Sequence, residues 1–320
     1  MRRTISAVAV ALLGTVVGCS SDETTMMMEE PPDDGLLPGF EVEAPGPNEI
    51  QLLTPILPEI APQEDVTLCT YLDYTTTEEF DVIHFRGFQS GEGHHAILYG
   101  ANEAMPPGTH VCAEADMFNT RYLGGTGGAD GAIAFDLPEG LAFRVHAGTQ
   151  LMIQTHWINF SDQPVRGQAA FNIHKRPPTA GVDPSDLFAD VTTQLALQPG
   201  PGSAHAQCEV QEPIKFFLLG GHAHEWGTRV SITVVPKEGT PEMIYDEAWG
   251  PEKVFDSKLN WYTKEQPLML AAGDRLDVDC VYENTTGEAL YFPSEMCVAF
   301  GYYFPATRQL NCVDNVWPGL

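Results

Sequence analysis

The sequence predicts an all-β protein built of β-sandwiches or jelly rolls. Apolar runs of four to nine residues recur along the chain, and breaks rich in Gly and Pro separate them. No amphipathic helical pattern extends beyond about two turns. Many short strands with Gly and Pro turns are typical of sandwiches and jelly rolls. The chain has 320 residues, which is enough for two such domains behind an N-terminal leader.

The first residues predict export and lipidation. Two arginines precede the apolar stretch Ile5–Val17, which is too short to span a bilayer. We expect residues 1–18 to be a signal peptide, and the residues around Cys19 resemble a bacterial lipobox in which this cysteine becomes the lipidated first residue. The alternative is an ordinary secretory signal with an incidental cysteine. Ser20 favours outer-membrane sorting, so we expect a lipid-anchored protein of the bacterial cell envelope.

Residues 19–48 are expected to form a disordered acidic tether, because they hold few large apolar side chains. Met26–Met28 within it is either a weak Cu(I) site or plain low-complexity sequence. The whole chain has 44 acidic and 16 basic residues and a net charge of −28. No basic patch is visible, so nucleic acid and anionic membrane surfaces are poor partners, and we expect no nucleic-acid binding. We expect a monomer.

The apolar runs predict strands in the following order. They cover residues 79–85, 95–99, 132–136, 150–157, 169–174, 216–219, 229–235, 275–282 and 296–304. Gly124–Gly128 and Gln198–Gly202 read as turns between them. The segment Lys175–Pro184 is the best boundary, and it divides the folded chain into domains at 49–178 and 179–320.

Six cysteines remain after Cys19, an even number that predicts disulfides in an oxidising compartment. They are Cys69, Cys112, Cys208, Cys280, Cys297 and Cys312. Spacing alone leaves 15 possible pairings open. None forms a Cys-x-x-Cys pair, so a zinc knuckle or a thioredoxin-type site is not expected.

Two histidine groups are candidate metal sites. In the strand that ends at Trp157, His156 shares a face with Gln154 and points away from the apolar face. His94 and His95 are adjacent, so both reach one metal only at a strand end or a bulge. An irregularity next to Gly93 could supply one. If His95 alone faced outward, the site would shrink to two histidines.

The second group is His222-Ala-His224, which follows an apolar run, with Met296 further along the chain. Residues i and i+2 of an extended segment point the same way, so the two imidazoles share a face. Two imidazoles with a thioether favour copper over zinc, because thioethers prefer Cu(I). Core histidines and a core methionine are the alternative for each residue taken alone.

Four segments together resemble the ligand motifs of the ascorbate-dependent type II copper monooxygenases. This is the family of peptidylglycine α-hydroxylating monooxygenase and dopamine β-monooxygenase. The segments, in order, are His94–Gly100, Leu151–His156, His222–His224 and Ser294–Cys297 with Tyr302-Tyr303. The resemblance extends from about residue 66 to residue 312.

The resemblance implies two jelly-roll domains in tandem that face each other across a cleft and hold two copper ions. It implies that His94, His95 and His156 hold an electron-storing copper. It implies that His222, His224 and Met296 hold the copper at which O₂ reacts, and that Gln154 lies near the first copper. Gln154 is equally well explained as a polar strand residue. The disulfides implied are Cys69–Cys112, Cys208–Cys312 and Cys280–Cys297.

Three positions depart from the family pattern. The residues that hold a peptide carboxylate in the peptidylglycine hydroxylases are replaced here by Gly220, Val298 and Phe300. A buried carboxylate without donors is costly, so we expect an apolar and roomier pocket. The function expected is hydroxylation of a C–H bond in a small apolar molecule by O₂, with ascorbate or another one-electron donor. The alternative is a copper-binding or copper-storage lipoprotein without turnover.

Overall fold

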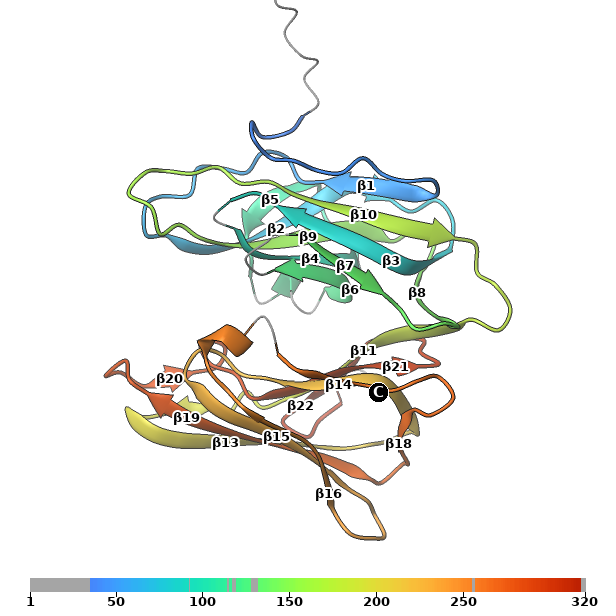
Figure 1. Ribbon diagram of the computed structural model, residues 1–320, viewed down its shortest axis with the longest axis vertical. Coiled ribbons are helices and arrows are strands. Elements are labelled where there is room, and N and C mark those ends of the chain that lie inside the picture. Colours follow the sequence, from blue (N-terminus) through green and yellow to red (C-terminus); the bar gives the residue numbers. More distant parts are fainter. Residues whose placement is uncertain are drawn as a thin grey trace, which may run out of the picture. The chain divides into compact units, whose positions relative to one another are not determined.

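The structure is a computed structural model that describes residues 35–91, 93–113, 115–116, 119–127, 132–254 and 257–317 (Figure 1). The expected signal peptide, Cys19 and the segment Met26–Met28 lie outside the described residues. Residues Gly35–Leu320 form one compact unit. The part of the chain that the structure describes contains no helix long and apolar enough to cross a membrane.

The all-β prediction is confirmed. The strands are β1 (Glu49–Leu53), β2 (Asp65–Thr75), β3 (Phe80–Gln89), β4 (Gly93–Ala101), β5 (Gly108–Val111), β6 (Thr120–Gly127), β7 (Ala132–Asp136), β8 (Leu141–Val145), β9 (Gln150–Ile158), β10 (Ala169–Arg176), β11 (Asp183–Val191), β12 (Ala196–Leu197), β13 (Gly200–Glu209), β14 (Ile214–His222), β15 (Gly227–Val235), β16 (Glu242–Ala248), β17 (Leu259–Trp261), β18 (Leu268–Leu270), β19 (Arg275–Asn284), β20 (Leu290–Tyr291), β21 (Val298–Phe304) and β22 (Leu310–Val313). A 3₁₀ turn, η1, spans Pro251–Lys253.

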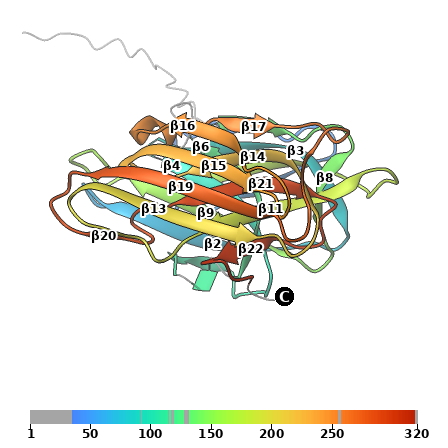
Figure 2. The same ribbon diagram turned by 90° about the horizontal axis from the view of Figure 1, so that it is seen from below.

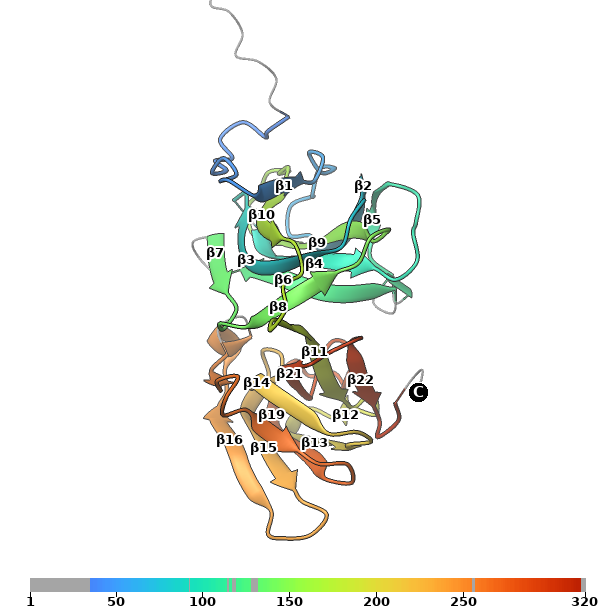
Figure 3. The ribbon, with the colours of Figure 1, turned by 90° about the vertical axis from the view of Figure 1, so that its right-hand side faces the viewer.

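The N-terminal half is a sandwich of two antiparallel layers (Figure 3). One layer contains β1, β10, β3, β7 and β8, and the other has the order β5-β2-β9-β4-β6. Apolar side chains from both layers, such as Phe85, Phe171, Leu98 and Ile153, form the core between them. The strand phase of β9 explains this packing, because Leu151 and Ile153 face the core and are fully buried.

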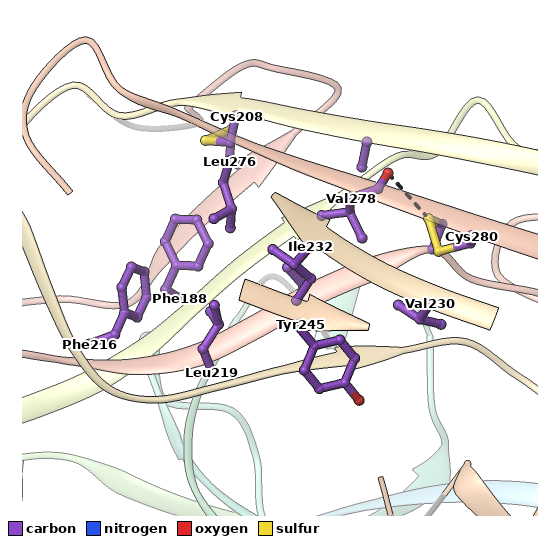
Figure 4. Packing of buried hydrophobic residues seen from close by; sticks show 14 of the residues in the cluster. Phe188, Cys208, Phe216, Leu219, Val230, Ile232, Tyr245, Leu276, Val278 and Cys280 are labelled. Atoms are coloured by element: carbon purple, nitrogen blue, oxygen red, sulfur yellow. Dashed lines mark hydrogen bonds between the residues drawn. A yellow bond between two sulfur atoms is a disulfide. The ribbon is translucent and has the colours of Figure 1, made fainter. Parts of the chain in front are cut away.

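The C-terminal half is a second sandwich. Its four-stranded layer has the order β13-β19-β15-β16, and these strands lie side by side in Figure 2. The facing layer contains β22, β11, β21, β14, β17 and β18. Figure 4 shows the core, where Phe188 and Phe216 of one layer pack with Ile232, Leu276 and Val278 of the other.

The two halves share more than the linker. Strand β8 pairs in parallel with β11, which extends one sheet through both halves. Phe217 and Tyr302 belong to the same buried cluster as the N-terminal core. Arg121 on β6 donates to the fully buried carboxylate of Asp186 on β11 at 2.6 Å. The two-domain division at residue 178 stays a prediction, and no strand occupies residues 177–182 between β10 and β11.

Two of the expected turns are wrong. Gly124–Gly127 belong to β6 and pair with His95–Leu98 of β4. The glycines are needed for space rather than for turning, because a Cβ at Gly124 would lie 2.7 Å from the ring of Phe85. In the same way, Gly200–Gly202 begins β13 and pairs with Tyr282–Asn284 of β19.

The structure contains three disulfides in the pairing that the family resemblance implies. They join Cys69 to Cys112, Cys208 to Cys312 and Cys280 to Cys297. The first lies within the N-terminal half and the other two within the C-terminal half. All six cysteines of the described chain are therefore paired, and a cysteine ligand for a metal is excluded among them.

Candidate metal centres

A β-bulge brings His94, His95 and His156 together. In the pairing of β4 with β9, Gly93 lies opposite Trp157 and His95 lies opposite His156, so His94 is an extra residue on β4. A bulge turns two adjacent side chains toward one side of a strand pair. The ligand nitrogens of the three histidines all lie within 4.8 Å of one another. The expected irregularity next to Gly93 is thus present in the structure.

The hydrogen bonds of His156 define which of its nitrogens faces the other histidines. Its Nε2 lies 2.7 Å from Oδ1 of Asp65, and its Nδ1 lies 3.0 Å from Nδ1 of His94. A carboxylate accepts the Nε2 proton, which leaves the lone pair on Nδ1. His156 therefore presents Nδ1 toward His94, as a metal ligand at this point would require.

Gln89 of β3 links β4 and β9, the two strands that carry the histidines. Its Nε2 donates to the backbone carbonyls of His95 at 3.1 Å and His156 at 3.2 Å. Gly93 leaves room for this side chain, because a Cβ at Gly93 would lie 2.3 Å from Cγ of Gln89. A residue with a side chain at position 93 would therefore collide with Gln89, which explains the glycine immediately before the histidine pair.

Burial keeps two of these imidazoles neutral. Desolvation, with a smaller contribution from the neighbouring His156, lowers the pKa of His94 to about 4. The same two causes, in the same order, lower the pKa of His95 to about 3. Neutral imidazole is the form that binds a metal ion. The three histidines therefore suit copper or zinc by donor chemistry, and the described chain adds no thiolate to favour zinc.

The second histidine pair lies at the end of β14. His222 is the last residue of the strand, and His224 lies just beyond it, with ring centroids 5.1 Å apart and planes at 82°. Nδ1 of His224 lies 3.0 Å from the carbonyl oxygen of Ser294, which leaves Nε2 of this ring available. Burial, followed by repulsion from His224, lowers the pKa of His222 to about 3.

Met296 lies in the connection that precedes β21. The strand begins at Val298 rather than at Met296 as expected, and Val298 pairs with His222. Two residues of β19 hold this segment. Tyr282 donates to the carbonyl oxygen of Met296 at 2.6 Å, and Cys280 forms a disulfide with Cys297. This segment is thus fixed beside the end of β14.

Glu295 joins the two ligand segments. Its carboxylate is fully buried and accepts hydrogen bonds from the backbone N–H groups of His224, Trp226 and Met296. Sequence reasoning missed this residue, as it missed Asp65 and Gln89. The available signal for Glu295 was its place next to a candidate ligand, and Gln89 lies only six residues before His95. Asp65, in contrast, lies far from the ligand motifs in the chain.

Gln154 is buried, and its amide nitrogen lies 3.9 Å from Sγ of Cys112. Its face of β9 is covered, since Met152 packs in a cluster with Tyr71 and Tyr99. A role for Gln154 in the reaction stays a prediction.

The side chains beside the end of β14, where His222 lies, are apolar, and together they form an apolar wall. Gly220 lies opposite Phe300 of β21 and opposite Leu259 of β17, and Val298 lies opposite His222. A Cβ at Gly220 would lie 2.7 Å from Cδ2 of Leu259 and 3.6 Å from the ring of Phe300. The space beside Gly220 is therefore filled by Leu259, Phe300 and the carbonyl oxygen of Lys258, which lies 3.3 Å from the same Cβ position. An apolar and roomier substrate pocket stays a prediction.

Comparison with known proteins finds a matching family model and mammalian relatives. Residues 195–319 match the family model described as copper type II ascorbate-dependent monooxygenase, C-terminal domain. Peptidyl-glycine alpha-amidating monooxygenase of Mus musculus is 25% identical over 287 residues, and the protein of the same name from Rattus norvegicus is 25% identical over 292 residues. Each match covers 82% of this chain but only 28% of the length of the mammalian protein.

Similarity to solved structures is weak. The major capsid protein P2 from Bacteriophage PM2 aligns with a TM-score of 0.39 and 10% identity, over 81% of this chain and 99% of that chain. A viral protein described by its triple jelly roll fold aligns with a TM-score of 0.23 and 6% identity, over 84% of this chain and 63% of that chain. The fold class stated above is drawn from the strands of this chain.

Proposed function

We propose, from the membership of this chain in the copper type II ascorbate-dependent monooxygenase family, that it hydroxylates a C–H bond of a small apolar substrate. O₂ is the oxidant, and ascorbate or another one-electron donor supplies electrons. The observation that supports this most is the presence of two separate donor sets, three imidazoles on β4 and β9 and two imidazoles beside Met296. Hydroxylation with O₂ needs two electrons, and two one-electron centres in one chain provide them.

Each donor set would hold one copper ion with its own role. When bound, the two copper ions would supply one electron each and the centre at which O₂ reacts. His94, His95 and His156 would hold the electron-storing ion. His222 and His224 would hold the other ion with Met296, whose thioether favours Cu(I). Asp65 and Ser294 would fix which imidazole nitrogen each ligand presents.

The apolar wall supports the substrate class. Leu259, Phe300 and Val298 lie beside the strand that ends in His222, and Gly220 offers no side chain. A carboxylate against this wall would lose its hydration without gaining a donor from these four residues, which is costly. We therefore propose a neutral, apolar substrate and not a peptide with a free carboxyl end. We further propose that lipid at Cys19 holds the protein in the bacterial cell envelope.

The test uses the full chain, loaded with copper, reduced with ascorbate and offered a series of small neutral hydrocarbons and a carboxylate-bearing peptide under ¹⁸O₂. We expect labelled hydroxylated product from an apolar compound and none from the peptide. Met296→Ile should form no product and should still retain the copper of the three-histidine site, because the change removes only the thioether. Met243→Ile, at an exposed methionine on β16, is the matched control.

Two outcomes would oppose the proposal. If the chain binds copper tightly but consumes no O₂ with any of the compounds offered, a copper-storage protein would be supported instead. Oxygenation by Met296→Ile at the rate of the unmodified chain would mean that Met296 is a packing residue and that the second donor set is wrongly assigned.

A further inference from the structure

We infer that Glu295 is a positioning residue, which fixes the segment of His222 and His224 and the segment of Met296 in one arrangement, so that their side chains reach one metal ion. The inference rests on the proposed function, because it assigns that ion to these three ligands. Glu295 itself is not a ligand in this arrangement, since its carboxylate is turned toward backbone N–H groups.

The contacts of Glu295 link segments that are distant in sequence. Oε1 accepts from the backbone N–H of His224 and from that of Met296, the latter at 2.9 Å, and Oε2 accepts from the N–H of Trp226 at 3.2 Å. Two of the three donors thus belong to candidate ligand residues. The side chain has no exposed surface, so water does not compete for these hydrogen bonds.

A carboxylate suits this place for a chemical reason. His224 and Trp226 lie between β14 and β15, and Met296 lies before β21, so their N–H groups are outside the strand ladders. A buried N–H without an acceptor is costly. An ionised carboxylate offers two oxygens with about four acceptor sites, whereas the amide of glutamine offers one acceptor oxygen and alanine offers none.

The Met296 segment is also joined to the end of β14 by the Ser294 carbonyl, which lies 3.0 Å from Nδ1 of His224, and by the pairing of Val298 with His222. Its remaining contacts are with a different strand. Tyr282 and the Cys280–Cys297 disulfide both tie it to β19. Glu295 instead ties it to the backbone of His224, which follows β14. Loss of the carboxylate should therefore loosen the spacing between His224 and Met296 while the Met296 segment stays attached to β19.

The test compares Glu295→Ala and Glu295→Gln in the full chain, each in a His94→Ala, His95→Ala background that removes the first site. Cu(I) affinity is measured by competition with a chromogenic chelator, and copper–sulfur scattering by X-ray absorption. We expect Glu295→Ala to weaken Cu(I) binding about tenfold or more and to reduce the copper–sulfur signal. Glu295→Gln should weaken Cu(I) binding less, because its carbonyl oxygen can still accept hydrogen bonds from the backbone N–H groups of both His224 and Met296.

Asp314→Ala is the matched control, because this carboxylate also accepts from a distant segment of the same half, at Thr192 and Thr193. It should lower thermal stability and leave Cu(I) affinity unchanged. A folded Glu295→Ala protein with unchanged Cu(I) affinity and copper–sulfur signal would overturn the inference. So would a loss in Glu295→Ala that Asp314→Ala reproduces. Failure of the unmodified chain to hydroxylate anything would oppose the proposed function alone, since both measurements report metal binding.

Discussion

The partner of each histidine ring decides how that ring can bind a metal. Asp65 accepts from Nε2 of His156, and the Ser294 carbonyl accepts from Nδ1 of His224. The first ring is left with Nδ1 and the second with Nε2 as its lone-pair nitrogen. His156 and His224 therefore offer different ring nitrogens to a metal, and the choice is made by groups that are themselves not candidate ligands.

Asp65→Ala should weaken the three-histidine site without removing a ligand. The ring of His156 would lose the acceptor that fixes its tautomer and orientation, and partners of this kind contribute about 10–100-fold to metal affinity. Titration of Cu(II) against a competing chelator in a His222→Ala, His224→Ala background measures this site. Asp162→Ala, at an exposed residue beyond β9, should bind as the unmodified chain does. Equal affinity in both variants would mean that Asp65 is a surface partner only.

Asp190 should make stability depend on pH. Its side chain is fully buried, both of its carboxyl oxygens are without a hydrogen-bond partner among the described residues, and burial together with repulsion from Asp277 raises its pKa to about 8. The folded state then keeps a proton that the unfolded state releases near pH 4. The contribution of Asp190 to stability therefore falls as pH rises from about 4 to 8.

Asp190→Asn removes this proton linkage. We expect the free energy of unfolding of the variant to increase relative to that of the unmodified protein as pH rises from 5 to 8. The increase is at most about 1.4 kcal/mol per pH unit, since one proton is involved. Urea unfolding of both proteins at several pH values measures the difference. A difference that is constant over this range would show that Asp190 is ionised, and otherwise satisfied, in the folded state.

At the scale of elements, the strands that the sequence predicts are those with a strong apolar pattern, such as β9 and β15. Among the strands that were missed or read as turns, β6 and β13 are rich in small and polar residues. Strand β13 reads GPGSAHAQCE, and its glycines and proline suggested a turn. Strand β6 holds glycines because Phe85 packs against it. Partners distant in sequence override local preference in both cases.

The candidate ligands could be selected from the sequence because their residue types carry the chemistry, and because His222 and His224 have the spacing of side chains on one face of a strand. The supporting residues were not, because Asp65 and Gln89 reach the site only through the pairing of β2, β9 and β4 and the packing of β3. No local pattern distinguishes such an aspartate or glutamine from a solvated one.

The bulge in β4 should depend on the absence of a side chain at Gly93. Gly93→Ala would place a Cβ 2.3 Å from Cγ of Gln89, so Gln89 must move and release the carbonyls of His95 and His156. We expect a loss of about 1–3 kcal/mol in the free energy of unfolding, together with weaker copper binding at the three-histidine site. Gly91→Ala is the control, because no atom lies within 4 Å of a Cβ at that position. Equal effects of the two changes on copper binding would contradict this account.

At the scale of the molecule, the halves are joined by a shared sheet and a shared core. The pairing of β8 with β11 and the burial of Phe217 and Tyr302 among N-terminal side chains join residues that are far apart in sequence. The Arg121–Asp186 pair adds a buried charge contact, in which desolvation raises the pKa of Asp186 to about 6 against the opposing effect of the arginine. Single-sequence patterns predict elements but not such pairings, which depend on the path of the whole chain.

The whole chain should bind two copper ions, one in each half. The ligands come from separate strand pairs, β4 with β9 and β14 with the segment before β21, so loss of one set leaves the other in place. Metal analysis after copper loading and desalting should give two ions per chain for the unmodified protein. It should give one for His94→Ala, His95→Ala and one for His222→Ala, His224→Ala. Only the first of these variants should keep copper–sulfur scattering, because its remaining site includes Met296. One ion in the unmodified chain, or loss of both ions from either variant, would mean that the two histidine groups do not act as independent centres.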